Sequence, residues 1–202
     1  MIGLNNFRFI VCGSGGHAAH LIALVSAAKL GQVIACCDDD VHRLGTQVMG
    51  VPVIGTIAEL GKELPAGGDA VGLGIGDPHV RKRLLTFGQR CGWHLPAIIH
   101  PLASIAVGAS VGDGTVVDAG AVVGARVSIG QGAIIEAGAS VAHDTQVGEC
   151  CHIEAGARIL AGARVGRGVR IGAGAVVQRQ VVVADGATIA SLVVVTASGL
   201  GA

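Results

Sequence analysis

The chain has 202 residues and a formal net charge of zero at neutral pH, because 14 basic side chains balance 14 acidic ones. Charged residues make up only 14% of it, against about 25% in an average soluble protein. With this balance, nothing in the composition argues for a nucleic-acid surface or an electrostatic contact with a membrane, and we expect neither partner. With 2% aromatic residues and 34 glycines, any core must consist of regularly stacked aliphatic side chains.

The apolar segments of the chain are short. No stretch of about 18 residues is free of glycine and charge, so we expect no helix that inserts into a membrane. The N-terminal sequence MIGLNNFRFIVCG leads into a glycine-rich turn and lacks the layout of a signal peptide. The six cysteines include no C-x-x-C and no zinc-ligand spacing. We therefore expect a cytoplasmic protein whose reduced cysteines serve as small hydrophobic side chains, with no bound metal.

The first half of the chain alternates between strand and helix patterns. Strands are expected over residues 7–13, 32–40, 52–55, 69–76 and 93–99, and helices over 17–31, 56–64 and 77–92. Asp77 is expected to cap the last of these helices. This order of elements is typical of a small Rossmann-like α/β domain with a parallel sheet, which we assign to residues 1–100.

The second half repeats every six residues. An aliphatic residue occupies every sixth position from Ile105 to Val195, sixteen times without a slip. The residue two places earlier is usually small, and glycine recurs one and three places later. This is the hexapeptide signature of a parallel β-helix, in which glycine supplies the corner dihedrals and three repeats close one triangular coil. We therefore expect an all-β domain of about five coils over residues 101–202.

Residues 18 apart should lie above one another in such a helix. His143 then has only Ala125 and Ala161 beside it in its column, which leaves room for a ligand. His152 should point outward from a flat face, between Ile134 and Arg170. A smooth corner, where another chain could lie close, is expected at Ala119, Ala137, Ala155 and Ala173.

A further column stacks three carboxylates, those of Asp118, Glu136 and Glu154, about 5 Å apart. Like charges at that spacing repel unless something intervenes. Two interpretations stay open. The column is a solvated edge with screened charges, or it lines a pocket for a substrate ammonium group or for an arginine of a neighbouring subunit.

Six segments of the chain resemble a known family. They are GSGGHA (13–18), CDDD (37–40), GVPVIGT (50–56), GIGDPHVRKRL (74–84), HP (100–101) and AHDTQVGECCHIEAGA (142–157). Together they are similar to the sugar O-/N-acyltransferases with hexapeptide repeats. These include nucleotide-aminosugar N-acetyltransferases of the bacillosamine and perosamine type and relatives that O-acetylate sialic acid. The resemblance implies a left-handed β-helix and a homotrimer, with active sites and acetyl-CoA between subunits.

The resemblance also implies roles for residues of the repeat. It makes His143 the general base, oriented by Asp144, and brings His152 to the acetyl end of acetyl-CoA. The co-substrate is expected along Ala161, Ala173 and Ser191. A histidine suits this chemistry because it takes a proton from the amine near neutral pH and returns it to the thiolate. No covalent intermediate is needed, so we assign no nucleophilic cysteine.

The N-terminal domain is expected to bind the nucleotide sugar. The resemblance places the phosphates at the glycine turn and the nucleoside at the end of the second strand, and Glu136 on the sugar side. The expected substrate-binding residues are Gly13, Gly15, Gly16, His17, Asp38, Asp39, Gly76, Asp77 and Glu136. Two features depart from the family. Glu136 replaces a common asparagine, and the ending SLVVVTASGLGA places Ser191 where glycine is expected.

The resemblance therefore implies an acetyl-CoA-dependent N-acetyltransferase that acts on a UDP-4-amino sugar in bacterial surface-glycan or glycoprotein biosynthesis. Sugar O-acetylation is the alternative, and a nucleotide-sugar-binding scaffold or sensor is the non-enzymatic one. The turn from Gly13 to Ala18 also fits the loose dinucleotide pattern G-x-G-x-x-A, although the attached β-helix favours a nucleotide sugar over NAD. A zinc hydratase is disfavoured, because only His143 and His152 lie in the repeat.

Overall fold

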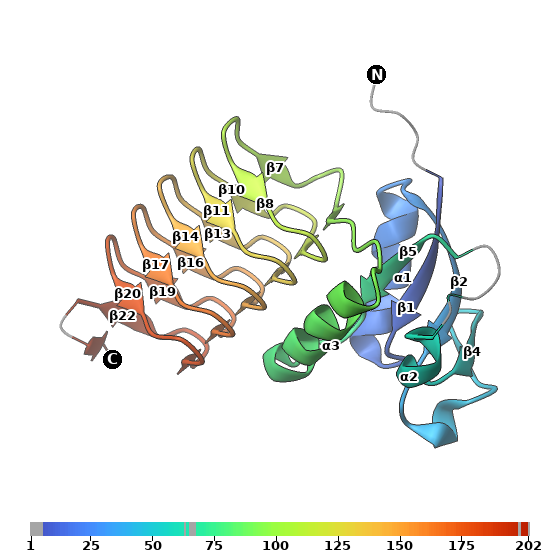
Figure 1. Ribbon diagram of the computed structural model, residues 1–202. Helices are drawn as coiled ribbons and strands as arrows, with labels where there is room; N and C mark the ends of the chain where they lie inside the picture. Colours follow the sequence, from blue (N-terminus) through green and yellow to red (C-terminus); the bar gives the residue numbers. More distant parts are fainter. Residues whose placement is uncertain (1–5, 63, 65–67, 198, 202) are drawn as a thin grey trace.

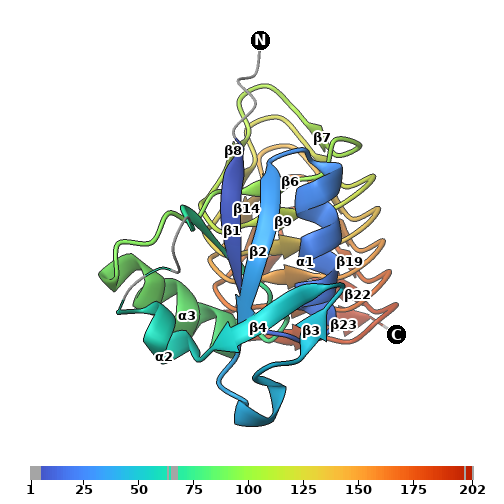
Figure 2. The ribbon, with the colours of Figure 1, turned by 90° about the vertical axis from the view of Figure 1, so that its right-hand side faces the viewer.

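The computed structural model describes residues 6–62, 64, 68–197 and 199–201. A small α/β part lies at one end of the molecule, and a stack of coils leads away from it (Figure 1). Seen from the α/β end, the sheet stands in front of the coils (Figure 2). The architecture is the predicted Rossmann-like unit followed by a left-handed β-helix.

The α/β part is a five-stranded sheet in the order β3-β4-β2-β1-β5. Its elements are β1 (Phe7–Cys12), α1 (Gly16–Ala27), β2 (Gly31–Cys37), a 3₁₀ turn (Val41–Arg43), β3 (Gln47–Val48), β4 (Val51–Gly55), α2 (Ile57–Leu60), β5 (Ala70–Leu73) and α3 (Pro78–Arg90). Four strands are parallel, as predicted, and the short β3 adds an unpredicted antiparallel edge next to β4. Asp77 caps α3 by accepting a hydrogen bond from the Val80 N–H, at 2.8 Å.

The predicted strand over residues 93–99 is wrong. Residues 93–97 are irregular and share one backbone bond with β5, from Val71 N to His94 O. Ile98–Ile99 instead form β6, which pairs with β9 (Val116–Val117) as the first rung of the β-helix. Pro96 lacks the N–H that a central strand needs, which accounts for the irregular segment. The division of the chain at residue 100 remains a prediction.

The β-helix has three sheets, whose rungs are 18 residues apart as predicted. The first sheet contains β6, β9, β12 (Ile134–Ile135), β15 (His152–Ile153), β18 (Arg170–Ile171) and β21 (Thr188–Ile189). The second contains β7 (Ser104–Ile105), β10 (Val122–Val123), β13 (Ser140–Val141), β16 (Arg158–Ile159), β19 (Val176–Val177), β22 (Val194–Thr196) and the unpredicted antiparallel β23 (Gly199–Gly201). The third contains β8 (Ser110–Val111), β11 (Ser128–Ile129), β14 (Gln146–Val147), β17 (Arg164–Val165) and β20 (Val182–Val183).

The corners of the coils need left-handed backbone. The third residue after each inward aliphatic side chain from Ile105 to Ile189 has a positive φ, and at ten of these corners it is glycine, which tolerates this φ because it lacks a Cβ. The other corners carry Arg126, Asp144, Cys150, Gln180 and Leu192. At these five corners the sequence departs from glycine, the residue that adopts a positive φ with the least strain.

The two parts of the chain share their cores. On one face of the α/β sheet, α1 packs against outward side chains of the first β-helix sheet, among them Val116 and Ile134. On the other face, Leu85 of α3 and its neighbours pack around Cys150. All six cysteines are free and five of them are buried, which confirms their predicted use as small hydrophobic side chains. Within the described ranges no helix is long and apolar enough to cross a bilayer.

Candidate active site

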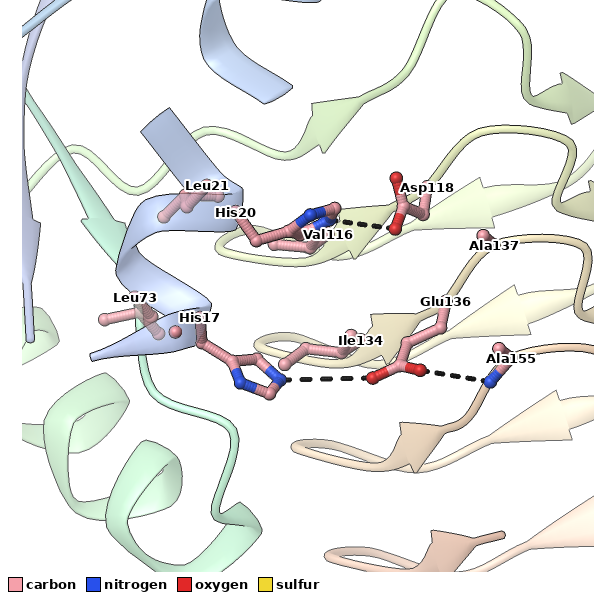
Figure 3. Close-up of a pocket in the computed structure, with 11 residues that line it drawn as sticks. His17, His20, Leu21, Leu73, Val116, Asp118, Ile134, Glu136, Ala137 and Ala155 are labelled. Atoms are coloured by element: carbon pink, nitrogen blue, oxygen red, sulfur yellow. Dashed lines mark hydrogen bonds and ion pairs between the residues drawn. The ribbon is translucent and has the colours of Figure 1, made fainter. Parts of the chain in front are cut away.

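A pocket of about 270 Å³ lies between α1 and the first sheet of the β-helix (Figure 3). Its apolar lining comes from both parts of the chain: Leu21, Leu73, Val116, Ile134, Ala137 and Ala155. Two histidines of α1 face two carboxylates of successive β-helix coils in this pocket (Figure 3). His20 Nε2 lies 2.8 Å from Asp118 Oδ2, and His17 Nε2 lies 4.0 Å from Glu136 Oε1. The pocket therefore combines an apolar lining with two histidine–carboxylate pairs.

His152 lies beside Glu136 and His17. It occupies the predicted position between Ile134 and Arg170, but the α/β part covers it and leaves it 1% exposed. Its Nδ1 lies 3.0 Å from the Gly76 carbonyl oxygen and its Nε2 lies 2.6 Å from Glu136 Oε1. Each nitrogen faces an acceptor, and a hydrogen on both nitrogens satisfies both contacts. In this arrangement neither nitrogen is free to contact acetyl-CoA, and the predicted contact remains untested.

His17 packs edge-on against His152, with ring centroids 5.4 Å apart. Burial, and then the neighbouring His152, lower the pKa of His17, so its ring is neutral at pH 7. A Cβ added at Gly76 would lie 2.5 Å from the His17 ring, which explains why this position is glycine. The structure thus brings together three of the predicted residues, His17, Gly76 and Glu136, around His152.

The three stacked carboxylates are each paired within the chain. Asp118 contacts His20 and is only 8% exposed, and Glu136 also accepts a hydrogen bond from the Ala155 N–H at 3.0 Å. Glu154 is held by Arg170 and by the Ala173 N–H. The interpretation as a solvated edge is wrong, because Asp118 and Glu136 line the pocket. The sequence could not show that histidines of α1 supply two of the partners.

A second pocket of about 350 Å³ opens at the glycine turn. Its lining includes predicted residues and others that the sequence analysis missed: Ser14, Gly15, Gly16, His17, Asp38, Asp40, Arg43, Gly74, Ile75 and Gly76. Ser14 Oγ donates to Asp38 Oδ2 at 2.5 Å, which fixes that carboxylate beside the turn. Arg43 adds a cation that the strand and helix patterns did not single out. His17 lines both pockets and stands between them.

Three of the predicted nucleotide-binding residues have structural roles within the chain. Gly13 is buried at a φ of +106°, and a Cβ there would lie 2.8 Å from the Gly74 carbonyl oxygen. Asp39 accepts a hydrogen bond from the Ile57 N–H at 3.0 Å and so anchors α2. Asp77 caps α3 and does not line the second pocket. None of the three lines the second pocket in the described structure, and their predicted contacts with a nucleotide stay predictions.

His143 stands on an exposed corner of the β-helix. Its Nδ1 lies 2.7 Å from Asp144 Oδ2, and its side chain is 54% exposed. Arg126, one coil earlier, donates two hydrogen bonds to the same carboxylate, of 2.6 and 2.8 Å. Arg126, and then His143, hold the pKa of Asp144 far below its usual range. An imidazole with its Nδ1 bound to a carboxylate presents Nε2 as a base.

Comparisons with known proteins agree with this architecture. Residues 8–86 match the PglD N-terminal domain, and residues 126–161 match the bacterial transferase hexapeptide of six repeats. The acetyltransferase domain of PglB from Neisseria gonorrhoeae FA1090 is 31% identical, with a TM-score of 0.86 over 95% of this chain and 92% of that one. The chain belongs to the sugar acyltransferase family of hexapeptide-repeat proteins. No curated protein matches it in sequence.

Two further structures carry ligands. One is the PglB domain in complex with acetyl coenzyme A, at 29% identity and a TM-score of 0.83 over 97% of this sugar acyltransferase and 98% of that chain. The other is a histidine-to-alanine mutant of GDP-perosamine N-acetyltransferase from Caulobacter crescentus in complex with CoA and GDP-perosamine. It is 30% identical, with a TM-score of 0.68 over 100% and 97% of the two chains.

One copy of this acyltransferase does not bring all the predicted site residues together. His143 and Ala161 lie at the corner between the second and third sheets, after β13 and β16. Glu136, Ala173 and Ser191 lie at the corner between the first and second sheets. The second sheet separates the two corners. Within one copy of the chain, the expected base and the pocket beside α1 therefore lie at different corners of the β-helix.

The atoms of His17, Glu136 and His152 lie within 4.8 Å of one another and are the described group able to hold a metal ion. The third ligand comes from α1, so counting histidines in the repeat missed it. Glu136 already contacts His152 directly at 2.6 Å, and this pair is satisfied without an ion. The prediction that no metal is bound stays a prediction.

The Glu136–His152 pair makes stability depend on pH. The hydrogen bond from His152 lowers the pKa of Glu136 in the folded protein. Its stabilising effect is therefore complete above the unfolded pKa of about 4.3 and is lost as the pH falls through the lower folded value. Urea unfolding should show wild type to be more stable than Glu136→Gln at pH 6, with a difference that shrinks below about pH 4. A constant difference from pH 3 to 7 would contradict this origin.

Proposed function

We propose that the protein is an N-acetyltransferase that moves the acetyl group of acetyl-CoA to the amine of a nucleotide-linked aminosugar. The observation that carries the proposal is His143, whose Nδ1 is bound to Asp144 and whose ring is open to a ligand. It stands on a β-helix fused to a domain with a pocket at a glycine turn. The ligands of the two related structures, acetyl coenzyme A and GDP-perosamine with CoA, support both substrates.

We further propose that the active enzyme is a homotrimer with its sites between subunits. The separation of His143 from Glu136 by the second sheet supports this arrangement, because a neighbouring copy can bring one corner against the other. The smooth corner formed by Ala137, Ala155 and Ala173 permits close approach of a chain. Acetyl-CoA would lie in the groove between two β-helices, along Ala161 of one wall and Ala173 and Ser191 of the other.

In the proposed reaction, the sugar ammonium group first loses one proton to solvent, and His143 Nε2 removes a second proton from the nitrogen as it attacks. The neutral amine attacks the thioester carbonyl, and backbone N–H groups at a coil corner stabilise the resulting oxyanion. Collapse of the tetrahedral intermediate breaks the C–S bond, and the imidazolium returns its proton to the leaving thiolate. Asp144 keeps the ring oriented and stabilises its charged form. Every proton is accounted for without a covalent acyl-enzyme.

In this proposal each pocket binds one end of the substrate, and His17 lies between the two ends. The Ser14–Asp38 pair and Arg43 would hold the nucleotide end, with its phosphates at the turn of Gly15 and Gly16. The sugar would enter the apolar pocket, where Glu136 replaces the family's usual asparagine. Burial of His152 suggests that it acts through Glu136, by fixing the carboxylate, and not by touching the thioester. A UDP-linked 4-amino sugar, made in the bacterial cytoplasm for glycans or glycoproteins, is the substrate we favour.

The test is a panel of nucleotide aminosugars and sialic acid with acetyl-CoA, followed by release of free thiol. We expect turnover with a UDP- or GDP-linked 4-amino sugar and an amide product by mass spectrometry. Turnover with sialic acid alone, giving an ester, would replace the proposal with O-acetylation. Thiol release at the hydrolysis background with every acceptor would overturn it.

A further inference from the structure

Two of the non-glycine corners lie directly on top of one another. Arg126 and Asp144 are 18 residues apart and have φ values of 58° and 62°, in a conformation that ten other corners leave to glycine. A side chain at such a φ carries backbone strain that glycine avoids. Of the five non-glycine corners, these two are joined to each other by hydrogen bonds.

The contact between them fixes the plane of a carboxylate. Arg126 Nε lies 2.6 Å from Asp144 Oδ1 and Arg126 Nη2 lies 2.8 Å from Oδ2, the two-point geometry that a guanidinium forms and an ammonium cannot. Oδ2 is also the oxygen that faces His143 Nδ1. Both side chains of the pair are largely exposed, and exposed ion pairs add little stability. Stabilisation of the fold therefore does not explain the pair.

We propose that Arg126 is a positioning residue that holds Asp144 so that His143 keeps its hydrogen on Nδ1 and presents a bare Nε2. The inference rests on the proposed function, in which Nε2 is the base. If Asp144 rotates away, the hydrogen is free to move to Nε2, and that nitrogen then has no lone pair to offer the substrate amine. Arg126 itself touches no reacting atom in this scheme.

The test substitutes Arg126→Gly, which removes the side chain and gives the corner its commonest residue. The matched control is Gln180→Gly, at a φ of 59° in the same column of corners, where no contact with Asp144 exists in the described structure. Nitrogen-15 spectra of the histidine rings report the tautomer directly, with His143→Gln to assign the signal. We expect the Nδ1–H form in wild type and Gln180→Gly, and loss of it in Arg126→Gly. An unchanged tautomer in Arg126→Gly would overturn the inference.

Kinetics give the second readout. At saturating substrates kcat of Arg126→Gly should fall by roughly tenfold with both KM values unchanged, a part of the 10²–10⁴ that a general base supplies. Arg126→Lys should recover only part of this loss. In an Asp144→Asn background the Arg126→Gly change should cost nothing more, because Arg126 acts through Asp144. An equal further loss in that background would contradict the inference. Activity retained in His143→Ala would instead refute the proposed base and leave the tautomer result standing.

Discussion

Replacing Arg81 by methionine should lower the free energy of unfolding by about 3–5 kcal/mol, because a buried guanidinium that serves several acceptors would be lost. Arg81 lies on α3 and is 0% exposed. Its guanidinium donates to five backbone carbonyls, those of Ile75, Gly76, Gly132, Cys150 and Cys151. Two belong to the α/β part and three to the β-helix, so one side chain ties both parts of the chain.

The arginine is held without a carboxylate. Burial lowers its pKa to about 10, which leaves it charged at neutral pH. Methionine would fill much of the space but would leave the carbonyl oxygens without donors, and each buried unsatisfied acceptor costs about 1–3 kcal/mol. Lysine carries only three N–H groups on one nitrogen and cannot reach five acceptors, so Arg81→Lys should lose an intermediate amount.

Urea unfolding followed by circular dichroism measures the difference. Arg83→Met is the matched control, since Arg83 is an exposed arginine on the same helix and should change stability by less than about 0.5 kcal/mol. If Arg81→Met unfolds at the same urea concentration as Arg83→Met, the five hydrogen bonds do not stabilise the fold. If Arg81→Met does not fold, Arg81→Lys still tests the prediction, because its free energy of unfolding should be lower than that of wild type.

The sequence pattern predicted which side chains point into the core of the β-helix. The six-residue register held from Ile105 to Val195, because an inward position in a narrow coil accepts only an aliphatic side chain. The 18-residue columns followed from it, including the neighbours of His152. The helix cap at Asp77 was readable because a cap is local. What covers an outward face was not readable, since periodicity carries no information about packing between distant segments.

The candidate site shows the same limit. His17 and Glu136 are 119 positions apart in the sequence, and only the packing of α1 on the β-helix brings them together. Nothing in the helix pattern distinguished Arg81 from the exposed charged residues of the same helix. Its burial depends on carbonyls of the β-helix coils. The strand predicted at residues 93–99 failed for a related reason. Its last two residues pair with the next coil and not with the α/β sheet.

His143→Ala should lower kcat by about 10²–10⁴, the usual contribution of a general base, and should leave the melting temperature unchanged. The imidazole is 54% exposed at a corner, and among the described side chains its hydrogen-bond partner is Asp144, so its removal opens no buried cavity. His79→Ala, an exposed histidine on α3, is the control and should keep full activity. If His143→Ala keeps more than a tenth of wild-type activity, the base lies elsewhere, and neutral His17 at the pocket becomes the candidate.

Mixing variants tests whether the base and the nucleotide pocket come from different copies. His143→Ala lacks the base, and Asp38→Ala disrupts the pocket, so each should be inactive alone. In randomly mixed trimers a site between subunits has an intact base from one chain and an intact pocket from the other in about a quarter of cases. Co-refolded mixtures should therefore recover about a quarter of wild-type activity. A site built within one chain would recover none, because no chain in the mixture carries both intact residues.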